Sequence, residues 1–456
     1  MTRAERAAAG KAMRATAPRS SHAGWSPAAD RDDPLDLLES QNRSRVQELV
    51  PIRFGRMLTS PFAFLRGSAL VMARDLARLP ATGIRVQACG DAHLLNYGVF
   101  GTQERNLVFG INDFDETYPG AWEWDVKRLA ASAVVAARFI GATESQAAEA
   151  ARSAVRSYRT RMAEYAELGN LELWYSYLDT DRILGILSPP TRAKAEEIIG
   201  KARGRTNLQV MAKTTELVGS DFRIIESPPL IVRIPESVGG DSLQTVLAAW
   251  LESYGASLVS DRRELLAKYR MIDAVRKVVG VGSVGTRCFV LLLRGEDERD
   301  PLFLQVKEAT TSVLERPGGR RPYHGKRVVE GQRLLQAAPD IFLGWGRLQR
   351  GDGPTVDFYV RQLRDMKGSV DVVPGVSRPA GAIEYTALCG WALALAHARS
   401  GDASMISGYL GSGEAFDEAV TSFAVGYADQ TERDHEALVK AVKDGRIHAE
   451  SDGATS

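Results

Sequence analysis

The chain has 456 residues, enough for a large core and about two or three domains. Its 58 basic and 57 acidic residues nearly balance, which gives no reason to expect nucleic acid or an acidic membrane as a partner. Three separated cysteines without CxxC spacing, Cys89, Cys288 and Cys389, argue against a disulfide framework and predict reduced thiols in a cytoplasmic protein. No apolar run reaches the roughly 18 residues of a membrane helix.

The first half of the chain predicts a tail followed by a mainly helical region. Residues 1–45 are rich in Ala, Arg, Ser and Asp, which indicates a mobile tail without a secretory signal. Helical periodicity occurs at 68–79 and 124–140, and short strand-like apolar runs occur at 84–88 and 107–111. Residues 145–270 predict several helices separated by Gly and Pro breaks.

The pattern changes near residue 272, where a β-rich region begins. Short β-branched and apolar runs predict strands at 274–279, 288–293 and 303–306. We therefore expect an α+β protein in which helices at 46–271 form a large lobe and residues 272–370 form a small antiparallel β lobe. C-terminal helices at 371–443 return to the helical lobe, and a frayed tail follows at 444–456.

The segment 89–116, CGDAHLLNYGVFGTQERNLVFGINDFDE, holds the most informative polar residues. Phosphoryl transfer needs a carboxylate near the acceptor hydroxyl, together with carboxylate and amide oxygens that hold Mg²⁺ on the phosphates. We expect Asp91 to orient or deprotonate the acceptor. Asn96, Asp113 and Asp115 are the expected metal ligands, with the choice between the two aspartates open. The alternative is that these aspartates only build a turn.

A glycine-rich segment supplies a second candidate site. Gly280, Gly282 and Gly285 form GxGxxG, a pattern found in dinucleotide-binding folds and in kinase loops. The β-prone run at 288–293 favours the tip of a hairpin, because a dinucleotide-binding loop opens a helix instead. We expect the backbone around these glycines and Ser283 to approach nucleotide phosphates. A purely structural hairpin is the alternative.

A lysine follows this hairpin. Lys307 ends the apolar run 303–306, 22 residues after Gly285, where its charge is expected to reach the α- and β-phosphates. The alternative is an edge-strand lysine directed at water. Its expected ion-pair partner is Glu330 on the next helix, with Glu315 as a weaker candidate.

Two family resemblances follow from these motifs. CGDAHLLNYG resembles the His-Gly-Asp-x-His-x-x-Asn loop of the aminoglycoside phosphotransferase and choline kinase branch of the protein kinase-like superfamily, with Cys89 in place of histidine. The same segment, with FLRG (64–67), GVGSVGTR (280–287) and RQLRDMKGS (361–369), resembles the bacterial domain of unknown function 2252 family over most of the chain. The kinase resemblance implies a two-lobed fold, ATP and Mg²⁺, and γ-phosphoryl transfer to a hydroxyl of a small molecule or a polar side chain.

The order of the motifs is unusual for a kinase. A kinase chain carries its glycine loop, lysine and glutamate before its catalytic and metal-binding residues. Here the catalytic candidates come first, by more than 160 residues. We therefore expect a circularly permuted kinase-like fold, which neighbouring chain ends permit. The alternatives are nucleotidyl (AMP) transfer on the same fold, a nucleotide-binding pseudokinase or regulatory protein, and a Rossmann oxidoreductase. The acceptor and the oligomeric state stay open.

Overall fold

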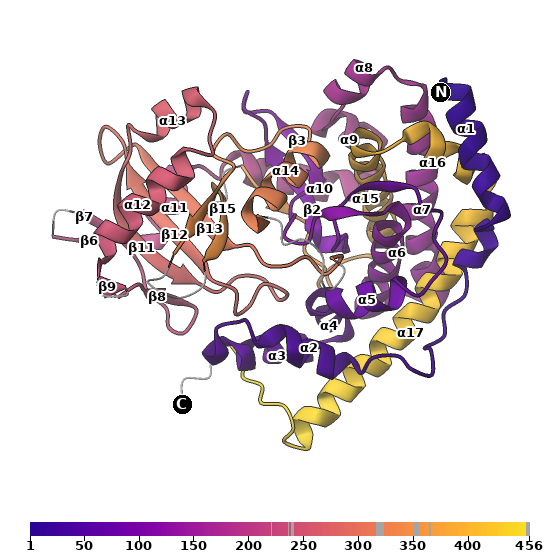
Figure 1. Ribbon diagram of the computed structural model, residues 1–456, viewed down its shortest axis with the longest axis horizontal. Coiled ribbons are helices and arrows are strands. Elements are labelled where there is room, and N and C mark those ends of the chain that lie inside the picture. The colour runs from indigo at the N-terminus through magenta and orange to yellow at the C-terminus, as the bar shows by residue number, and fades with distance from the viewer. Residues whose placement is uncertain are drawn as a thin grey trace.

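The computed structural model describes residues 1–219, 221–235, 237–238, 241–315, 323–349, 355–363 and 366–452. In this part of the chain, a helical region lies beside a sheet region built on antiparallel strands (Figure 1). The α+β class expected from the sequence is therefore confirmed. Within the same residues, each helix is too short or too polar to cross a lipid bilayer. The three cysteines are free and buried, as expected for reduced thiols.

The helical region has a core of helices that bury many small side chains. Its helices are α1 (Arg3–Ala12), α2 (Pro34–Asn42), α3 (Val50–Leu58), α4 (Pro61–Gly67), α5 (Ala69–Leu76), α6 (Trp122–Phe139), α7 (Glu144–Glu167), α8 (Asn170–Tyr175), α9 (Thr180–Ile186), α10 (Pro189–Arg203), α15 (Pro379–Ser400), α16 (Ala403–Leu410) and α17 (Ala415–Lys443). A Cβ atom at Gly390 of α15 would lie 2.0 Å from the carbonyl oxygen of Ala154 on α7. Small residues thus let the central helices approach closely.

The N-terminal residues pack on this core, so the expectation of a mobile tail at 1–45 is wrong. Helix α1 lies against α16 in Figure 1. A Cβ atom at Gly10 would lie 1.9 Å from the carbonyl oxygen of Met405, and one at Gly408 would lie 2.1 Å from that of Ala7. The two helices therefore meet backbone to backbone, and glycine is required on both sides of the contact.

The C-terminal residues also pack on the helical region. Ile447 is 5 % exposed, and the backbone N–H of Glu450 donates to the carbonyl oxygen of Pro51 at 3.0 Å. The predicted frayed tail is therefore wrong for residues 444–452, and residues 453–456 lie outside the described part of the chain.

The sheet region is organised by one antiparallel sheet, in which the described residues form six strands in the order β14-β15-β13-β12-β11-β8. These strands are β8 (Ile231–Arg233), β11 (Arg270–Lys277), β12 (Cys288–Arg294), β13 (Pro301–Glu308), β14 (Gly344–Leu348) and β15 (Val356–Gln362). Because side chains alternate along a strand, Lys307 and its neighbour Val306 lie on opposite faces of this sheet. The two faces of the sheet therefore contact different parts of the protein.

Smaller sheets carry the polar loops of the helical region. Within the described residues, β16-β2-β3-β5 form one sheet and β1-β4 form another, while β6-β7 and β9-β10 are hairpin pairs. The strands are β1 (Arg85–Ala88), β2 (Tyr97–Gly101), β3 (Leu107–Ile111), β4 (Tyr118–Ala121), β5 (Leu178–Asp179), β6 (Thr215–Val218), β7 (Asp221–Ile224), β9 (Ser237–Val238), β10 (Asp241–Ser242) and β16 (Gly368–Ser369). The strands β1 and β3 match the predicted runs closely.

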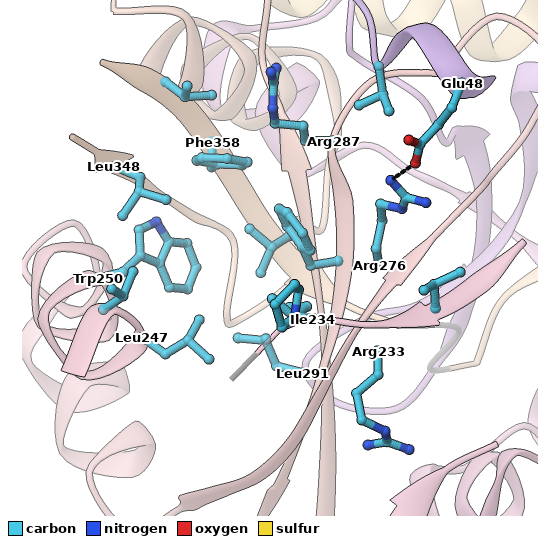
Figure 2. Close-up of a pocket in the computed structure, with 17 residues that line it drawn as sticks. Glu48, Arg233, Ile234, Leu247, Trp250, Arg276, Arg287, Leu291, Leu348 and Phe358 are labelled. Atoms are coloured by element: carbon cyan, nitrogen blue, oxygen red, sulfur yellow. Dashed lines mark hydrogen bonds and ion pairs between the residues drawn. The ribbon is translucent and has the colours of Figure 1, made fainter. Parts of the chain in front are cut away.

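The sheet region begins earlier in the chain than the predicted boundary at 271/272. Its remaining helices are α11 (Asn207–Thr214), α12 (Leu243–Gly255), α13 (Ser260–Leu266) and α14 (His324–Leu335). Trp250 and Tyr254 of α12 share a core cluster with Phe358 of β15, and β8 pairs with β11. The boundary is wrong because an apolar helix that precedes residue 272 completes the sheet's core. The same helix and the sheet border a cavity of about 690 Å³ (Figure 2).

Candidate functional site

The turn after β1 is held in place by a buried carboxylate. Asp125, in the first turn of α6, is 1 % exposed and accepts backbone N–H groups from Cys89 at 2.6 Å and Gly90 at 2.9 Å. The Nε2 atom of His397 on α15 lies 3.0 Å from the same carboxylate. Gly90 has φ +85°, and a Cβ there would lie 2.4 Å from the carbonyl oxygen of Glu116. Asp125 therefore has a structural role, since it fixes the backbone of this turn.

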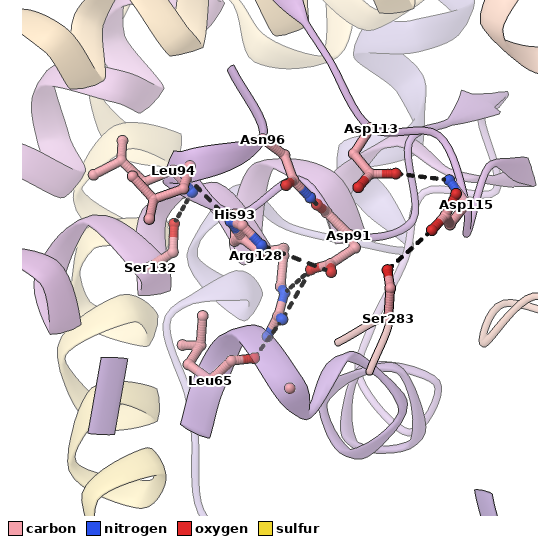
Figure 3. Close-up of polar contacts among 12 residues, drawn as sticks. Leu65, Asp91, His93, Leu94, Asn96, Asp113, Asp115, Arg128, Ser132 and Ser283 are labelled. Atoms are coloured by element: carbon pink, nitrogen blue, oxygen red, sulfur yellow. Dashed lines mark hydrogen bonds and ion pairs between the residues drawn. The ribbon is translucent and has the colours of Figure 1, made fainter. Parts of the chain in front are cut away.

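This turn presents Asp91 to a guanidinium group of α6 (Figure 3). The Nε and Nη2 atoms of Arg128 both lie 2.9 Å from Oδ1 of Asp91, and Nη2 also donates to the carbonyl oxygen of Leu65 at 2.6 Å. Burial raises the pKa of Asp91, while the charges of Arg128 and Arg66 oppose the rise. Asp91 thus has a fixed orientation and a raised proton affinity. The sequence interpretation missed Arg128, three residues after Asp125 on the same helix.

Side chains of the loop after Asp91 make hydrogen bonds with the backbone of the same loop. Nδ2 of Asn96 donates to the carbonyl oxygen of Asp91 at 2.7 Å, which leaves Oδ1 of Asn96 as its metal-binding atom. Nδ1 of His93 accepts the N–H of Leu95 at 3.2 Å, and burial lowers the pKa of the His93 imidazole well below its usual value. A neutral histidine with this contact orients the loop.

The loop after β3 brings the two distant motif sets together. Nζ of Lys307 lies 2.5 Å from Oδ2 of Asp115 and 3.8 Å from Oδ1 of Asp113, and its side chain is 2 % exposed. The lysine is therefore not directed at water. Ser283 of the glycine segment also donates its hydroxyl to Oδ2 of Asp115 at 3.2 Å (Figure 3). Residues that the sequence separates by 168 and 192 positions thus share one carboxylate.

The two aspartates differ in how fully their oxygens are engaged. Oδ2 of Asp115 faces Lys307 and Ser283, and Oδ1 accepts the hydroxyl of Tyr359. Asp113 accepts the backbone N–H of Asp115 at 3.3 Å on Oδ1, and its Oδ2 makes no hydrogen bond within the described residues. Asp113 is therefore the aspartate with a carboxylate oxygen free for a ligand.

Burial and neighbouring charges shift the pKa values of Asp113, Asp115 and Lys307. Burial raises the pKa of both carboxyls, but Lys307, Tyr359 and other neighbours outweigh it at Asp115 and lower that pKa to about 2. The pKa of Asp113 is raised by burial and by the Asp115 charge. Burial acts to lower the pKa of Lys307, yet the two carboxylates raise it well above its usual value. Lys307 and Asp115 therefore form a charged pair at neutral pH.

The glycine segment is a turn between β11 and β12, and it packs on the N-terminal part of the helical region. Gly280 and Gly285 have φ +66° and φ +86°, which glycine adopts without strain. Val284 is fully buried, and the carbonyl oxygen of Gly285 accepts the N–H of Val46 at 2.8 Å. A Cβ at Gly282 would lie 3.1 Å from the carbonyl oxygen of Arg66. The strand that follows, rather than a helix, contradicts the Rossmann alternative.

The expected partner of Lys307 is wrong. Glu330 lies on the outer side of α14, where its side chain is 57 % exposed and pairs with Lys326 one turn away at 3.5 Å. The inner side of α14 presents Arg327, which donates to the carbonyl oxygen of Asp115 at 2.9 Å. Glu315 pairs with Arg327 at 3.6 Å and does not reach Lys307 either. Neither glutamate contacts Lys307, and Asp115 of the aspartate loop supplies its counter-charge instead.

Two further cations near Asp113 were not singled out from the sequence. Arg361 on β15 donates to the carbonyl oxygen of Asn112 at 2.8 Å. Burial and Arg361 lower the pKa of Lys367 to about 7, although Asp113 opposes this shift. Lys367 follows Met366, which has φ 45°. A non-glycine residue in this conformation is strained, and such strain concentrates at functional sites. Both residues lie in the segment 361–369, which is one of the segments of the family resemblance described for the sequence. Residues 364–365 of this segment lie outside the described part of the chain.

The donor set suits a metal ion that binds together with a nucleotide. Among the described residues, no group of three or more His, Cys, Asp or Glu side chains is placed to hold a metal alone. Mg²⁺ usually takes one or two carboxylates and completes its octahedron with water and phosphate oxygens. Asp113 and Asn96 offer hard oxygen donors of this kind, next to cations that suit phosphates.

Comparison with known proteins gives one family match. The model described as "Uncharacterized protein conserved in bacteria (DUF2252)" matches residues 45–441. Searches of curated proteins and of solved structures return no match to the chain. The matched range includes both the aspartate loops and the glycine and lysine segments that meet in the site.

Proposed function

The chain belongs to the DUF2252 family, and we propose that it is a Mg²⁺- and ATP-dependent phosphotransferase with a circularly permuted, two-lobed kinase-like fold. One observation carries this proposal. Lys307, at the end of a sheet strand, lies 2.5 Å from Asp115 and 3.8 Å from Asp113, in the loop that follows the Asp91 turn. A phosphate-binding lysine, metal-binding carboxylates and a fixed acceptor-side carboxylate are the parts that phosphoryl transfer needs.

The proposed reaction transfers the γ-phosphoryl group to an acceptor hydroxyl. The hydroxyl oxygen forms the new P–O bond, the bond to the β-phosphate oxygen breaks, and ADP leaves. Asp91 orients the hydroxyl and takes its proton, and its burial-raised pKa favours that step. Arg128 keeps the carboxylate in position through contacts at 2.9 Å.

The remaining polar residues bind the nucleotide. Asn96 and Asp113 would hold Mg²⁺, which supplies charge neutralisation on the phosphates when bound. Lys307 contributes a point charge to the phosphates, and Asp115 keeps that lysine in place. The turn at Gly280, Gly282, Ser283 and Gly285 would offer its backbone to phosphate oxygens; Ser283 already reaches Asp115 at 3.2 Å.

The chain order supports the permuted arrangement. The strand β13 with Lys307, the helix α14 and the strands β14 and β15 follow one another as the lysine-bearing part of a kinase does, yet they come after the Asp91 and Asp113 loops in the chain. The contacts of Ser283 and Lys307 with Asp115 support a single site for both motif sets. The small-molecule acceptor rests on the resemblance to aminoglycoside and choline kinases alone.

The first experiment is calorimetric titration of ATP into the full chain, with and without Mg²⁺. Wild type, Asp113→Ala and Lys307→Ala are compared, and Asp297→Ala serves as the control because Asp297 is a surface residue paired with Arg299. We expect Mg²⁺-dependent binding that both site substitutions weaken and the control leaves unchanged. No ATP binding by the wild type in either condition would refute the proposal.

A second experiment separates the proposal from its alternatives. ATP labelled at the γ-phosphate or at the α-phosphate is incubated with the protein and with pools of hydroxyl-bearing acceptors. Transfer of the γ-label that Asp91→Asn abolishes supports phosphoryl transfer, whereas transfer of the α-label indicates nucleotidyl transfer. ATP binding without transfer of either label, equal in wild type and Asp91→Asn, would indicate a pseudokinase.

A further inference from the structure

A cavity of about 690 Å³ lies on the sheet face opposite to the one that presents Lys307. It is bordered by strands of the sheet, by α12 and by the segment before α3 (Figure 2). Val306 lines this cavity, while its neighbour Lys307 faces the aspartates, so the sheet separates the cavity from the proposed phosphotransfer site. The inference below therefore does not depend on that proposed function.

Most of the wall is apolar and deeply buried. Trp250, Leu291, Val306 and Phe358 line the cavity and are each at most 4 % exposed. The indole N–H of Trp250 has no hydrogen-bond partner among the described residues. Cavities of roughly 300–1,000 Å³ with an apolar lining and few polar groups are the usual form of a small-molecule site. The side chains that line the cavity lack van der Waals partners on the side of the void, and the apolar body of a bound ligand would supply those contacts.

The charged residues of the wall are gathered at one side. In Figure 2, Arg276, Arg233 and Glu48 lie across the cavity from Trp250 and Leu247. Arg287 also lines the cavity, whereas the guanidinium of Arg233 is held by Asp273 at 2.7 Å and by Glu226 at 3.5 Å. Each of these arginines is paired with a carboxylate, so this side of the cavity holds ion pairs next to an apolar interior.

The arginines keep donors for a ligand although each already has a protein partner. Arg276 uses Nη1 to pair with Glu48 at 2.5 Å, and Arg287 uses Nη1 to pair with Glu308 at 2.9 Å. A guanidinium group has five N–H donors in a planar fork that matches a carboxylate. Within the described residues, the hydrogen bonds that these two side chains donate all use Nη1. Their remaining donors are available to an anion.

We propose that this cavity is a binding site for an amphipathic carboxylate, with an unbranched aliphatic or comparably slender apolar body. The apolar body lies along Trp250 and Leu291, and the carboxylate meets Arg276 and Arg287. Apolar burial supplies most of the affinity, and the charge-assisted hydrogen bonds select an anion over a neutral analogue.

The test uses dodecanoate as the probe, below its micellar concentration, in calorimetric titration against the full chain. Dodecanol is the neutral comparison. We expect saturable binding of one dodecanoate, with dodecanol at least about tenfold weaker, because a hydrogen bond to a charged group contributes on this scale. No saturable dodecanoate binding would overturn the proposal, and equal binding of the alcohol would overturn its anionic part.

Two variants locate the site. Arg276→Gln removes one guanidinium from the wall, and Leu247→Trp fills part of the interior. Arg299→Gln is the matched control, because Arg299 is a surface residue whose side chain is 85 % exposed. We expect both site variants to weaken dodecanoate at least about tenfold and the control to bind as wild type. Unchanged binding in both site variants would overturn the assignment.

Circular dichroism and melting temperature confirm that each variant is folded. If Leu247→Trp fails to fold, Leu348→Trp fills the cavity from β14 instead and carries the same expectation. ATP titration of the same variants provides an independent readout: binding there is expected to be unchanged, since the sheet lies between the two sites. Loss of dodecanoate binding with ATP binding intact supports a separate site.

Discussion

Removing the charge of Asp115 tests whether this residue anchors Lys307. In Asp115→Asn, the lysine stays 2 % exposed, and its nearest remaining carboxylate is Asp113 at 3.8 Å. Loss of one partner from a buried ion pair costs about 3–5 kcal/mol, because the other charge is left uncompensated. Asp113 compensates in part, so we expect the free energy of unfolding to fall by about 2–3 kcal/mol. Urea unfolding followed by circular dichroism measures this change.

The pH dependence of stability gives the same test a second readout. The folded pKa of Asp115 is about 2, below its usual value of 3.8, so its contribution is present above the unfolded pKa and lost as pH falls toward 2. Lys307 has a raised folded pKa, so its contribution is present below its unfolded pKa of 10.5 and lost only as pH rises through the folded value. In Asp115→Asn we expect stability to decline at lower alkaline pH than in wild type.

The control for this prediction is Asp297→Asn, which breaks a surface pair with Arg299 and is expected to leave the unfolding midpoint unchanged. The anchoring role would be refuted if Asp115→Asn unfolded like wild type while Asp113→Asn lost stability. That outcome would make Asp113 the counter-ion of Lys307, despite the longer distance between their charged atoms.

Other predictions concern the Asp91 turn and the cations around it. Arg128→Lys keeps a charge but loses the two-nitrogen contact with the carboxylate, so we expect turnover to fall at least about tenfold with the Kd for ATP unchanged, as single-turnover kinetics and calorimetry would measure. In Gly90→Ala, the new Cβ atom would clash with the backbone and the residue would also have a positive φ. We expect this variant to have a lower melting temperature than Gly141→Ala, in which φ is +82° but the Cβ atom would point into open space. The pKa of Lys367 is about 7, so ATP affinity in wild type should weaken as pH rises through that value, whereas Lys367→Gln should bind with a flat pH profile in calorimetry.

Several parts of the candidate site could be predicted because they depend on short-range patterns. The spacing of Asp91 and Asn96, and the arrival of Asp113 at the end of an apolar strand, identified the two polar loops. Lys307 at the end of another strand was recognised in the same way. The local pattern of apolar residues indicates where a strand or helix ends and which residue follows it. That information was enough to identify each of these residues.

The missed features depend on which elements pack together. Glu330 was a reasonable partner for Lys307 by chain position, but the orientation of α14 turns it to solvent, with 57 % of its side chain exposed. Arg128 contacts Asp91 because α6 packs beneath the turn. The residues of α1 are mostly small or charged, and the role of Gly10 becomes clear only when Gly408 of α16 lies beside the same helix. The spacing of residues along the sequence does not show which helices contact each other in the fold.

The pairing of α1 with α16 has a consequence for synthesis of the chain. Arg14, just after α1, donates to the carbonyl oxygens of Gly408 and Tyr409, partners that lie 394 and 395 positions later. At about 5–20 residues per second, these residues leave the ribosome roughly 20–80 s before their partners exist. Helix α1 is therefore synthesised long before its native neighbour, and this part of the helical region finishes folding only after α16 has been made.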